Sequence, residues 1–150
     1  MKKILVCLGM VAVALSAACG PGASSTKPTP ASSAQQPIEV QINLTEFKIE
    51  PSMTSFKVGV PYRLVVSNKG TVNHDFSISS PVMGGMAGMD AEHAHANALA
   101  VIDANDMPPG ATKTIDLTFS KPYSASEMEF ACHTPGHYEA GMQLPITVTQ

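Results

Sequence analysis

Residues 131–142, ACHTPGHYEAGM, hold one cysteine, two histidines and one methionine at close spacing: Cys132, His133, His137 and Met142. Glycine and proline interrupt this stretch, which predicts a loop. Four residues separate Cys132 from His137, and four more separate His137 from Met142. Because thiolate, imidazole and thioether groups all bind metals, this is a candidate metal-binding loop whose nature depends on the rest of the chain.

Outside this loop, apolar and polar residues alternate with a period of two. Ile38, Val40, Ile42 and Leu44, for example, share one face of residues 38–44. Further short runs, bounded by Gly, Pro and Asn, cover residues 46–52, 53–59, 61–68, 72–79, 112–120, 126–132 and 144–150. Short alternating runs with turn signals between them predict an all-β fold, an antiparallel sandwich or barrel.

The N-terminal region has the composition of an export signal followed by a tether. MKK is a short basic segment, and an apolar run of twelve residues and the small residues SAACG follow it. Residues 1–19 are therefore expected to be a signal peptide. Their end resembles a lipobox with Cys19 as the lipidated residue, although Ser16 stands where Leu is usual. Residues 20–37, rich in Pro, Ser and Thr, predict a flexible linker, which leaves one folded domain over residues 38–150.

Charge and cysteine content limit the classes of function. The chain has a formal net charge of −3 and no basic patch for nucleic acid. The predicted domain has six Lys and Arg against twelve Asp and Glu, and this net charge of −6 either steers a basic partner or serves solubility. Once Cys7 leaves with the signal and Cys19 carries lipid, Cys132 is the remaining cysteine and no internal disulfide can form. A lone thiol outside the cytoplasm is open to oxidation, so we expect it to be protected or used.

The donor types distinguish between the sites that such a loop can form. Thiol enzymes usually place the nucleophile at the start of a helix, and zinc sites usually have more cysteines. A thiolate, two imidazoles and a weak thioether instead match a type 1, or blue, copper site. This predicts a second histidine far away in sequence, and His74, in TVNHDF, supplies it. The predicted ligands of one copper ion are His74, Cys132, His137 and Met142.

These residues resemble those of the cupredoxins, the family of type 1 blue copper proteins. NHDF is similar to the first-ligand strand of that family, and C…PGH…GM is similar to its ligand loop. The Cys–His spacing and the Pro-Gly-His turn look most like the auracyanins, membrane-tethered electron carriers of the plastocyanin type. The resemblance covers nearly all of residues 38–150 and implies a Greek-key β-sandwich or barrel of about 7–8 strands.

The resemblance also implies roles for residues around the metal. Cys132 is the short thiolate ligand, Met142 is the weak axial ligand that tunes the potential, and the ring edge of His137 is the electron port. Five residues are expected to support them, by a hydrogen bond between strand and loop, by packing beneath the metal or by shaping the turn: Asn73, Phe76, Phe130, Pro135 and Gly136. His133 is expected to point away from the metal, as a surface or supporting residue.

The segment at about residues 80–100 interrupts the strand pattern and predicts a long loop, with a short helix from Asp90. It contains donors for both oxidation states of copper: Met83, Met86, Met89, His93 and His95. A second, weaker copper site is one interpretation. A Met-rich docking surface and a tolerated insertion are two others, and we favour these non-metal interpretations.

The leading hypothesis is a non-enzymatic protein that carries single electrons outside the cytoplasm, between a membrane-associated redox donor and acceptor. It is expected to act as a monomer, held at the membrane by its lipid anchor, or secreted if Cys19 is not lipidated. The alternative is copper binding, delivery or tolerance through the Met/His-rich loop 83–95. A multicopper enzyme is disfavoured because the chain has one domain and only five histidines.

Overall fold

The computed structural model describes residues 35–81 and 95–150. The expected signal peptide, most of the linker, the start of the helix expected from Asp90, and Met83, Met86, Met89 and His93 lie outside the described residues. His95 and Ala96, which are described, are helical. Ten strands and a short 3-10 helix occur in the order β1 (Ile38–Thr45), β2 (Lys48–Pro51), β3 (Ser55–Lys57), β4 (Pro61–Asn68), β5 (Phe76–Ser79), β6 (Ala100–Ile102), η1 (Ala104–Asp106), β7 (Thr112–Thr118), β8 (Glu129–Ala131), β9 (Gln143–Pro145) and β10 (Thr147–Thr149). None of the helices described is long and apolar enough to cross a membrane.

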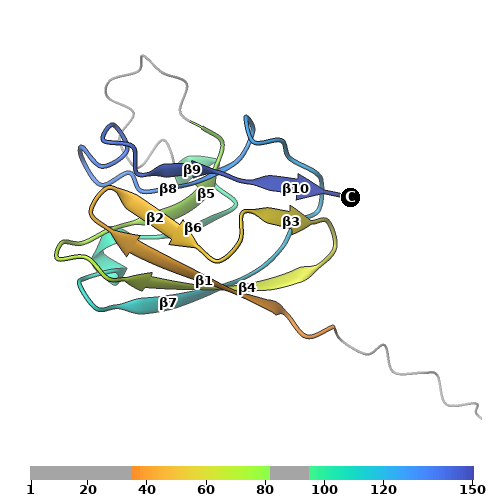
Figure 1. Cartoon of the computed structure of the whole chain (residues 1–150), viewed down its shortest axis with the longest axis horizontal. Coiled ribbons are helices and arrows are strands. Elements are labelled where there is room, and N and C mark those ends of the chain that lie inside the picture. The colour runs from red at the N-terminus through yellow and green to blue at the C-terminus, as the bar shows by residue number, and fades with distance from the viewer. Residues whose placement is uncertain (1–34, 82–94) are drawn as a thin grey trace, which may run out of the picture. The chain divides into compact units, whose positions relative to one another are not determined.

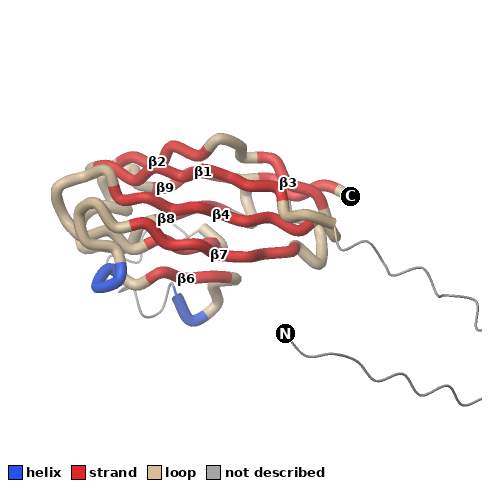
Figure 2. The backbone as a smooth tube through the Cα atoms, turned by 90° about the horizontal axis from the view of Figure 1, so that it is seen from below, coloured by secondary structure: helices blue, strands red, loops and turns tan. Residues whose placement is uncertain are grey.

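The strands form a sandwich, as the alternating pattern predicts. One sheet has the order β2-β1-β4-β7, the other has the order β6-β5-β8-β9, and β10 and β3 form a pair at one end. Figure 1 shows the first sheet below and the second above, and Figure 2 shows β1, β4 and β7 side by side. The expectation of a wholly antiparallel fold is corrected at two pairs, because β1 and β4, and β3 and β10, run parallel.

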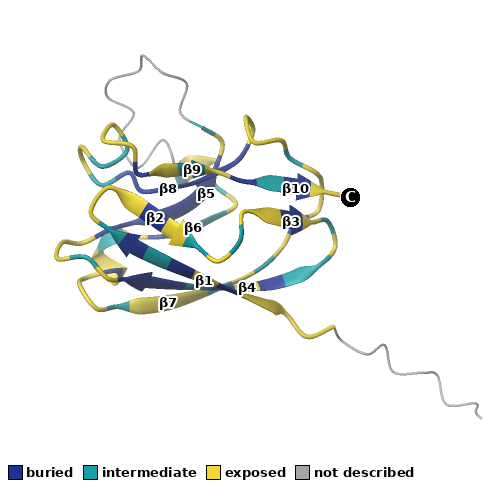
Figure 3. Ribbon diagram, viewed as in Figure 1, coloured by how far each residue is buried: buried dark blue, intermediate teal, exposed yellow. Residues whose placement is uncertain are grey.

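The core lies between the two sheets. Val40, Ile42 and Leu44 of β1 are fully buried, which confirms the period of two in this strand. Every residue of β5 and β8 is buried, because these are the central strands of the upper sheet. The largest aromatic side chains fill the middle, where Phe130 packs on Phe56 and Phe76 with ring centroids 5.9 and 5.2 Å apart. Figure 3 shows this buried layer between exposed outer residues.

Several strands are shorter than the sequence pattern predicts. The run at 46–52 begins only at Lys48, because Thr45 pairs with Lys48 and Glu46 and Phe47 form a two-residue turn between them. The run at 72–79 is a strand only from Phe76 onward, so His74 lies in the β4–β5 loop and not in a strand. The strand count reaches ten because Ala100–Ile102 forms β6 outside the predicted runs, and because the run at 144–150 divides into β9 and β10.

At that end, on the left of Figure 1, three connections lie near one another: the β1–β2 turn, the β4–β5 loop and the loop between β8 and β9. The C-terminus and the start of β1 lie at the opposite end. The loop that carries the predicted ligands is thus presented by rigid strands, an arrangement typical of binding sites.

Candidate metal centre

The β4–β5 and β8–β9 loops bring three predicted ligands into contact. His74 Nδ1 lies 3.2 Å from His137 Nδ1, and Cys132 Sγ lies 3.8 Å from the first nitrogen and 3.6 Å from the second. Cys132 and His74 are fully buried. Histidine, cysteine, aspartate and glutamate side chains can all bind metal ions. Among the residues that the structure describes, these three are the one group of such side chains whose ligand atoms lie close enough to share an ion.

The spacing of the three donor atoms fits a trigonal metal site. Bonds of about 2.0–2.3 Å from one ion to imidazole and thiolate, spread evenly in a plane, separate the donors by about 3.5–3.8 Å. The distances here are 3.2–3.8 Å. One soft thiolate and two imidazoles in a plane are the donor set that selects copper in type 1 sites. The residues present therefore fit a copper ion.

Main-chain hydrogen bonds place Met142 beside the other residues of the loop. Cys132 donates its N–H to Met142 O at 3.0 Å, and Met142 donates its own to His137 O at 2.9 Å. Met142 is fully buried, so its thioether lies inside the domain, where it would be available as the predicted weak ligand of a copper ion. The turn in between needs Gly136, whose φ of 83° is in the left-handed region. Pro135 precedes this glycine and is exposed.

His74 is held by the backbone of the β4–β5 loop. It donates its N–H to Met107 O at 3.3 Å, and the buried Asn68 side chain donates to the carbonyls of Met107 and Val72. A Cβ at Gly70 would lie 2.9 Å from His74 Nε2, so only glycine allows the loop to pass this close to the ring. His74 Nε2 is buried and has no hydrogen-bond partner among the described residues.

The surroundings of the cluster favour its uncharged forms. Burial, followed by the nearby Asp75 carboxylate, raises the pKa of the Cys132 thiol to about 12. Burial, followed by the neighbouring His137, lowers the pKa of His74. The protein without metal therefore holds a protonated thiol beside a neutral imidazole, and metal binding must displace the thiol proton.

The metal-free protein should lose stability as the pH falls. Unfolded His74 takes up a proton near pH 6.5, whereas the lowered pKa keeps folded His74 neutral to a lower pH. Protonation of His74 therefore favours the unfolded state. The folded state is most stable above the unfolded pKa of His74 and loses stability as the pH falls below it. The urea midpoint should therefore fall between about pH 7.5 and about pH 5.5, and His74→Gln should reduce this fall. An equal fall in that variant would contradict the assignment.

Asp75 ties the two ligand loops together. Its Oδ1 accepts the N–H groups of His133 at 2.7 Å and Thr134 at 2.9 Å, directly after the ligand Cys132. The tie was predicted for Asn73, which the structure places at the surface. The hydrogen bonds between the loops thus come from the residue after His74 and not from the residue before it.

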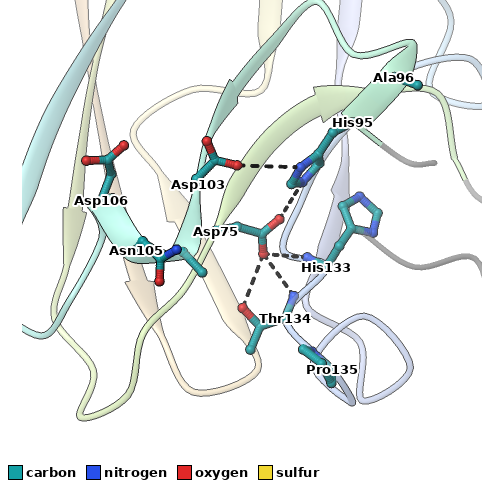
Figure 4. Close-up of a pocket in the computed structure, with 10 residues that line it drawn as sticks. Asp75, His95, Ala96, Asp103, Asn105, Asp106, His133, Thr134 and Pro135 are labelled. Atoms are coloured by element: carbon teal, nitrogen blue, oxygen red, sulfur yellow. Dashed lines mark hydrogen bonds and ion pairs between the residues drawn. The ribbon is translucent and has the colours of Figure 1, made fainter. Parts of the chain in front are cut away.

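The other carboxylate oxygen of Asp75 binds the segment that follows the long loop. His95 Nε2 lies 2.7 Å from Asp75 Oδ2, and His95 Nδ1 lies 4.0 Å from Asp103 Oδ1. Figure 4 shows both contacts at the edge of an open pocket of about 910 Å³, which His133 and Pro135 also line. His95 is thus fixed beside the ligand loop.

His133 is buried, which favours the expected supporting role over a surface position. Its ring stacks on Tyr138 at 4.9 Å and meets the edge of His95 at 5.7 Å. Tyr138 donates its hydroxyl to the buried Glu129 at 2.7 Å. Burial lowers the pKa of His133, the effect of His95 adds to this, and Asp75 opposes it. Phe76 and Phe130 are fully buried in β5 and β8, beneath the loops.

Four residues around the cluster were not predicted from the sequence: Glu46, Phe47, Gly70 and Asp75. Asp75 directly follows His74, and an acidic residue beside a predicted ligand could have indicated a tie. Gly70 follows Lys69 in an obvious turn, but its closeness to His74 depends on the fold. The aromatic contact of Phe47 with His137, with centroids 5.2 Å apart, joins positions ninety residues apart in sequence.

Solved structures show the same fold. The chain matches the reduced auracyanin of Roseiflexus castenholzii with a TM-score of 0.57 and 22% identity, over 77% of this chain and 99% of the other. It matches auracyanin A of Chloroflexus aurantiacus with a TM-score of 0.54 and 16% identity, over 75% and 99%. The fold is that of the cupredoxins, as the ligand motifs predicted.

Curated proteins also resemble the chain in sequence. The copper-resistant cuproprotein CopI of Rubrivivax gelatinosus is 31% identical over 128 residues, which are 81% of this chain and 72% of that protein. The protein of the same name from Pseudomonas aeruginosa is 29% identical over 96% of this chain and 93% of its own length. No family model matches the chain.

Proposed function

The chain belongs to the family of the copper-resistant cuproprotein CopI, and on this basis we propose that it is an extracytoplasmic type 1 copper protein that supports copper tolerance by exchanging single electrons. The observation that carries the proposal is the buried cluster of His74, Cys132 and His137, with donor atoms 3.2–3.8 Å apart. The predicted export signal supports the location.

The protein holds the donors in place, and copper supplies a one-electron change between Cu(II) and Cu(I) when bound. Cys132 is fixed by its N–H bond to Met142 O, and His74 is fixed by its N–H bond to Met107 O. Asp75 holds the backbone that follows Cys132. Burial of Cys132 and His74 excludes water from two of the three donors. A site that moves little between oxidation states exchanges electrons rapidly, and this favours a redox role over release of the metal.

We expect a non-enzymatic role with a redox protein as partner. The half-buried His137 is the ligand closest to solvent and offers the route for the electron. An anchor at Cys19 would keep the domain near a membrane-associated donor and acceptor, and the linker would allow it to reach both. The domain is expected to act as a monomer.

Delivery of copper by the long loop is the second candidate function. The name of the CopI relatives, which refers to copper resistance, favours it as much as electron exchange. The contact of His95 with Asp75 is the observation in its favour, because it holds one end of the Met/His-rich segment beside the metal centre.

Growth in copper separates the two candidates. A strain without the gene would receive the wild-type gene, Cys132→Ser, or a loop variant with Met83, Met86 and Met89 replaced by leucine. If electron exchange at the centre provides tolerance, the Cys132 variant should fail to restore growth and the loop variant should restore it. The reverse pattern would support delivery by the loop and overturn the proposal. Equal export of all three proteins is checked by immunoblotting.

A further inference from the structure

The β1–β2 turn contains a strained aromatic residue. Only Glu46 and Phe47 lie between the paired residues Thr45 and Lys48, and Phe47 has a φ of 61°. Among the described residues, it is the one non-glycine residue at positive φ. A bulky side chain in this region is an outlier, and glycine occupies it without strain. Something other than local backbone preference must therefore keep phenylalanine here.

Core packing does not explain this residue, because Phe47 is 51% exposed. Its ring instead meets His137 edge-on, with centroids 5.2 Å apart and planes at 71°. His137 is the partly exposed member of the donor cluster, whereas the other two are fully buried. The strained residue thus lies against the most exposed residue of the cluster.

The preceding residue, Glu46, anchors the same turn near the other histidine ligand, His74. The Glu46 carboxylate accepts hydrogen bonds from the N–H and hydroxyl of Thr71. A Cβ at Gly70 would lie 2.8 Å from Glu46 Oε1 and 2.9 Å from His74 Nε2, so the carboxylate and the ring both lie close to this glycine. The two-residue turn therefore lies near both histidine ligands, and the bonds to Thr71 fix its position relative to the β4–β5 loop that carries His74.

We propose that Phe47 is a positioning residue of the metal centre, which covers the solvent side of His137 and limits the access of water and of small redox reagents to it. The proposal rests on the proposed function, since it assumes copper at the cluster. Strained backbone persists at functional sites when the surroundings over-determine it, and Glu46 supplies that constraint here. An apolar cover lowers the local dielectric, and this favours the less charged Cu(I) state and raises the reduction potential.

The test compares Phe47→Gly with Phe47→Tyr, which keeps the ring. Ile38→Gly is the matched control, because Ile38 is similarly exposed at the opposite end of β1. Three quantities are measured: the denaturation midpoint without metal, the rate at which diethyl pyrocarbonate modifies His137 without metal, and the reduction potential of the copper protein. The rate of oxidation by ferricyanide is added for the copper-loaded protein.

For Phe47→Gly we expect an unchanged or higher midpoint, because the strain is relieved. We also expect several-fold faster modification of His137, a lower potential and several-fold faster oxidation by ferricyanide. Phe47→Tyr should retain wild-type values. Ile38→Gly should change neither the rate of His137 modification, nor the reduction potential, nor the rate of oxidation by ferricyanide. If His137 modification and the potential are unchanged in Phe47→Gly, the proposal is overturned. If wild type forms no copper–thiolate complex, the proposed function fails instead, and the modification rate still reports on the cover.

Discussion

Cys132→Ser should abolish the intense visible absorption of the copper protein and lower its affinity for copper by more than about 100-fold. Loss of a residue that only supports a metal ligand already lowers the metal affinity or the activity of a protein by about 10–100-fold. Cys132 is itself a donor, with its Sγ 3.8 and 3.6 Å from the two histidine nitrogens. A serine hydroxyl is a hard and weakly acidic group, so the soft thiolate that favours copper is lost.

The variant should still fold without metal. Replacing a buried thiol by a hydroxyl costs about 1–3 kcal/mol if the hydroxyl finds no partner, which is less than the stability of a typical domain. Absorption spectra, competition with a copper chelator and urea unfolding of the metal-free protein measure the three effects. Cys132→Ala serves as a second variant without the hydroxyl. Wild-type affinity in both variants would show that the metal binds elsewhere.

Phe130→Ala should destabilise the metal-free domain by about 3–5 kcal/mol, the usual cost of truncating a buried phenylalanine. Phe130 is fully buried and packs on the rings of both Phe56 and Phe76. It belongs to β8, whose next residues lead directly into Cys132. The cavity should therefore also loosen the ligand loop and broaden the copper spectrum.

Urea unfolding of the metal-free protein measures the free energy lost. Leu117→Ala provides the control, since Leu117 lies partly buried on the edge strand β7, away from the ligand loops, and should cost no more than about 2 kcal/mol. Equal losses in the two variants would contradict the central place given to Phe130 beneath the site.

The fold could be predicted from sequence where the pattern was local. Val40, Ile42 and Leu44 alternate with polar residues, and all three are buried as this alternation requires. The parallel pairing of β1 with β4 could not be predicted in this way, because it depends on where the chain returns and not on periodicity. The two-residue turn at Glu46 and Phe47 was missed because it lacks the glycine or asparagine usual at positive φ.

The donor cluster followed from residue types and spacing, because few groupings of thiol, imidazole and thioether have another use. The hydrogen bonds that support it did not follow. Asp75 binds His133, Thr134 and His95, which are 20 or more positions away in sequence, and this becomes visible only when the loops are in place. The same holds for Gly70, whose role depends on the position of the His74 ring.

The most direct test of the account is a titration of the purified protein with Cu(II), followed by visible absorption and electron paramagnetic resonance. The account predicts an intense thiolate-to-copper band that saturates at one equivalent, with the narrow copper hyperfine splitting of a type 1 site. A colourless or weakly coloured complex with the wide splitting of ordinary Cu(II) would contradict it, because His74, Cys132 and His137 would then not share the metal.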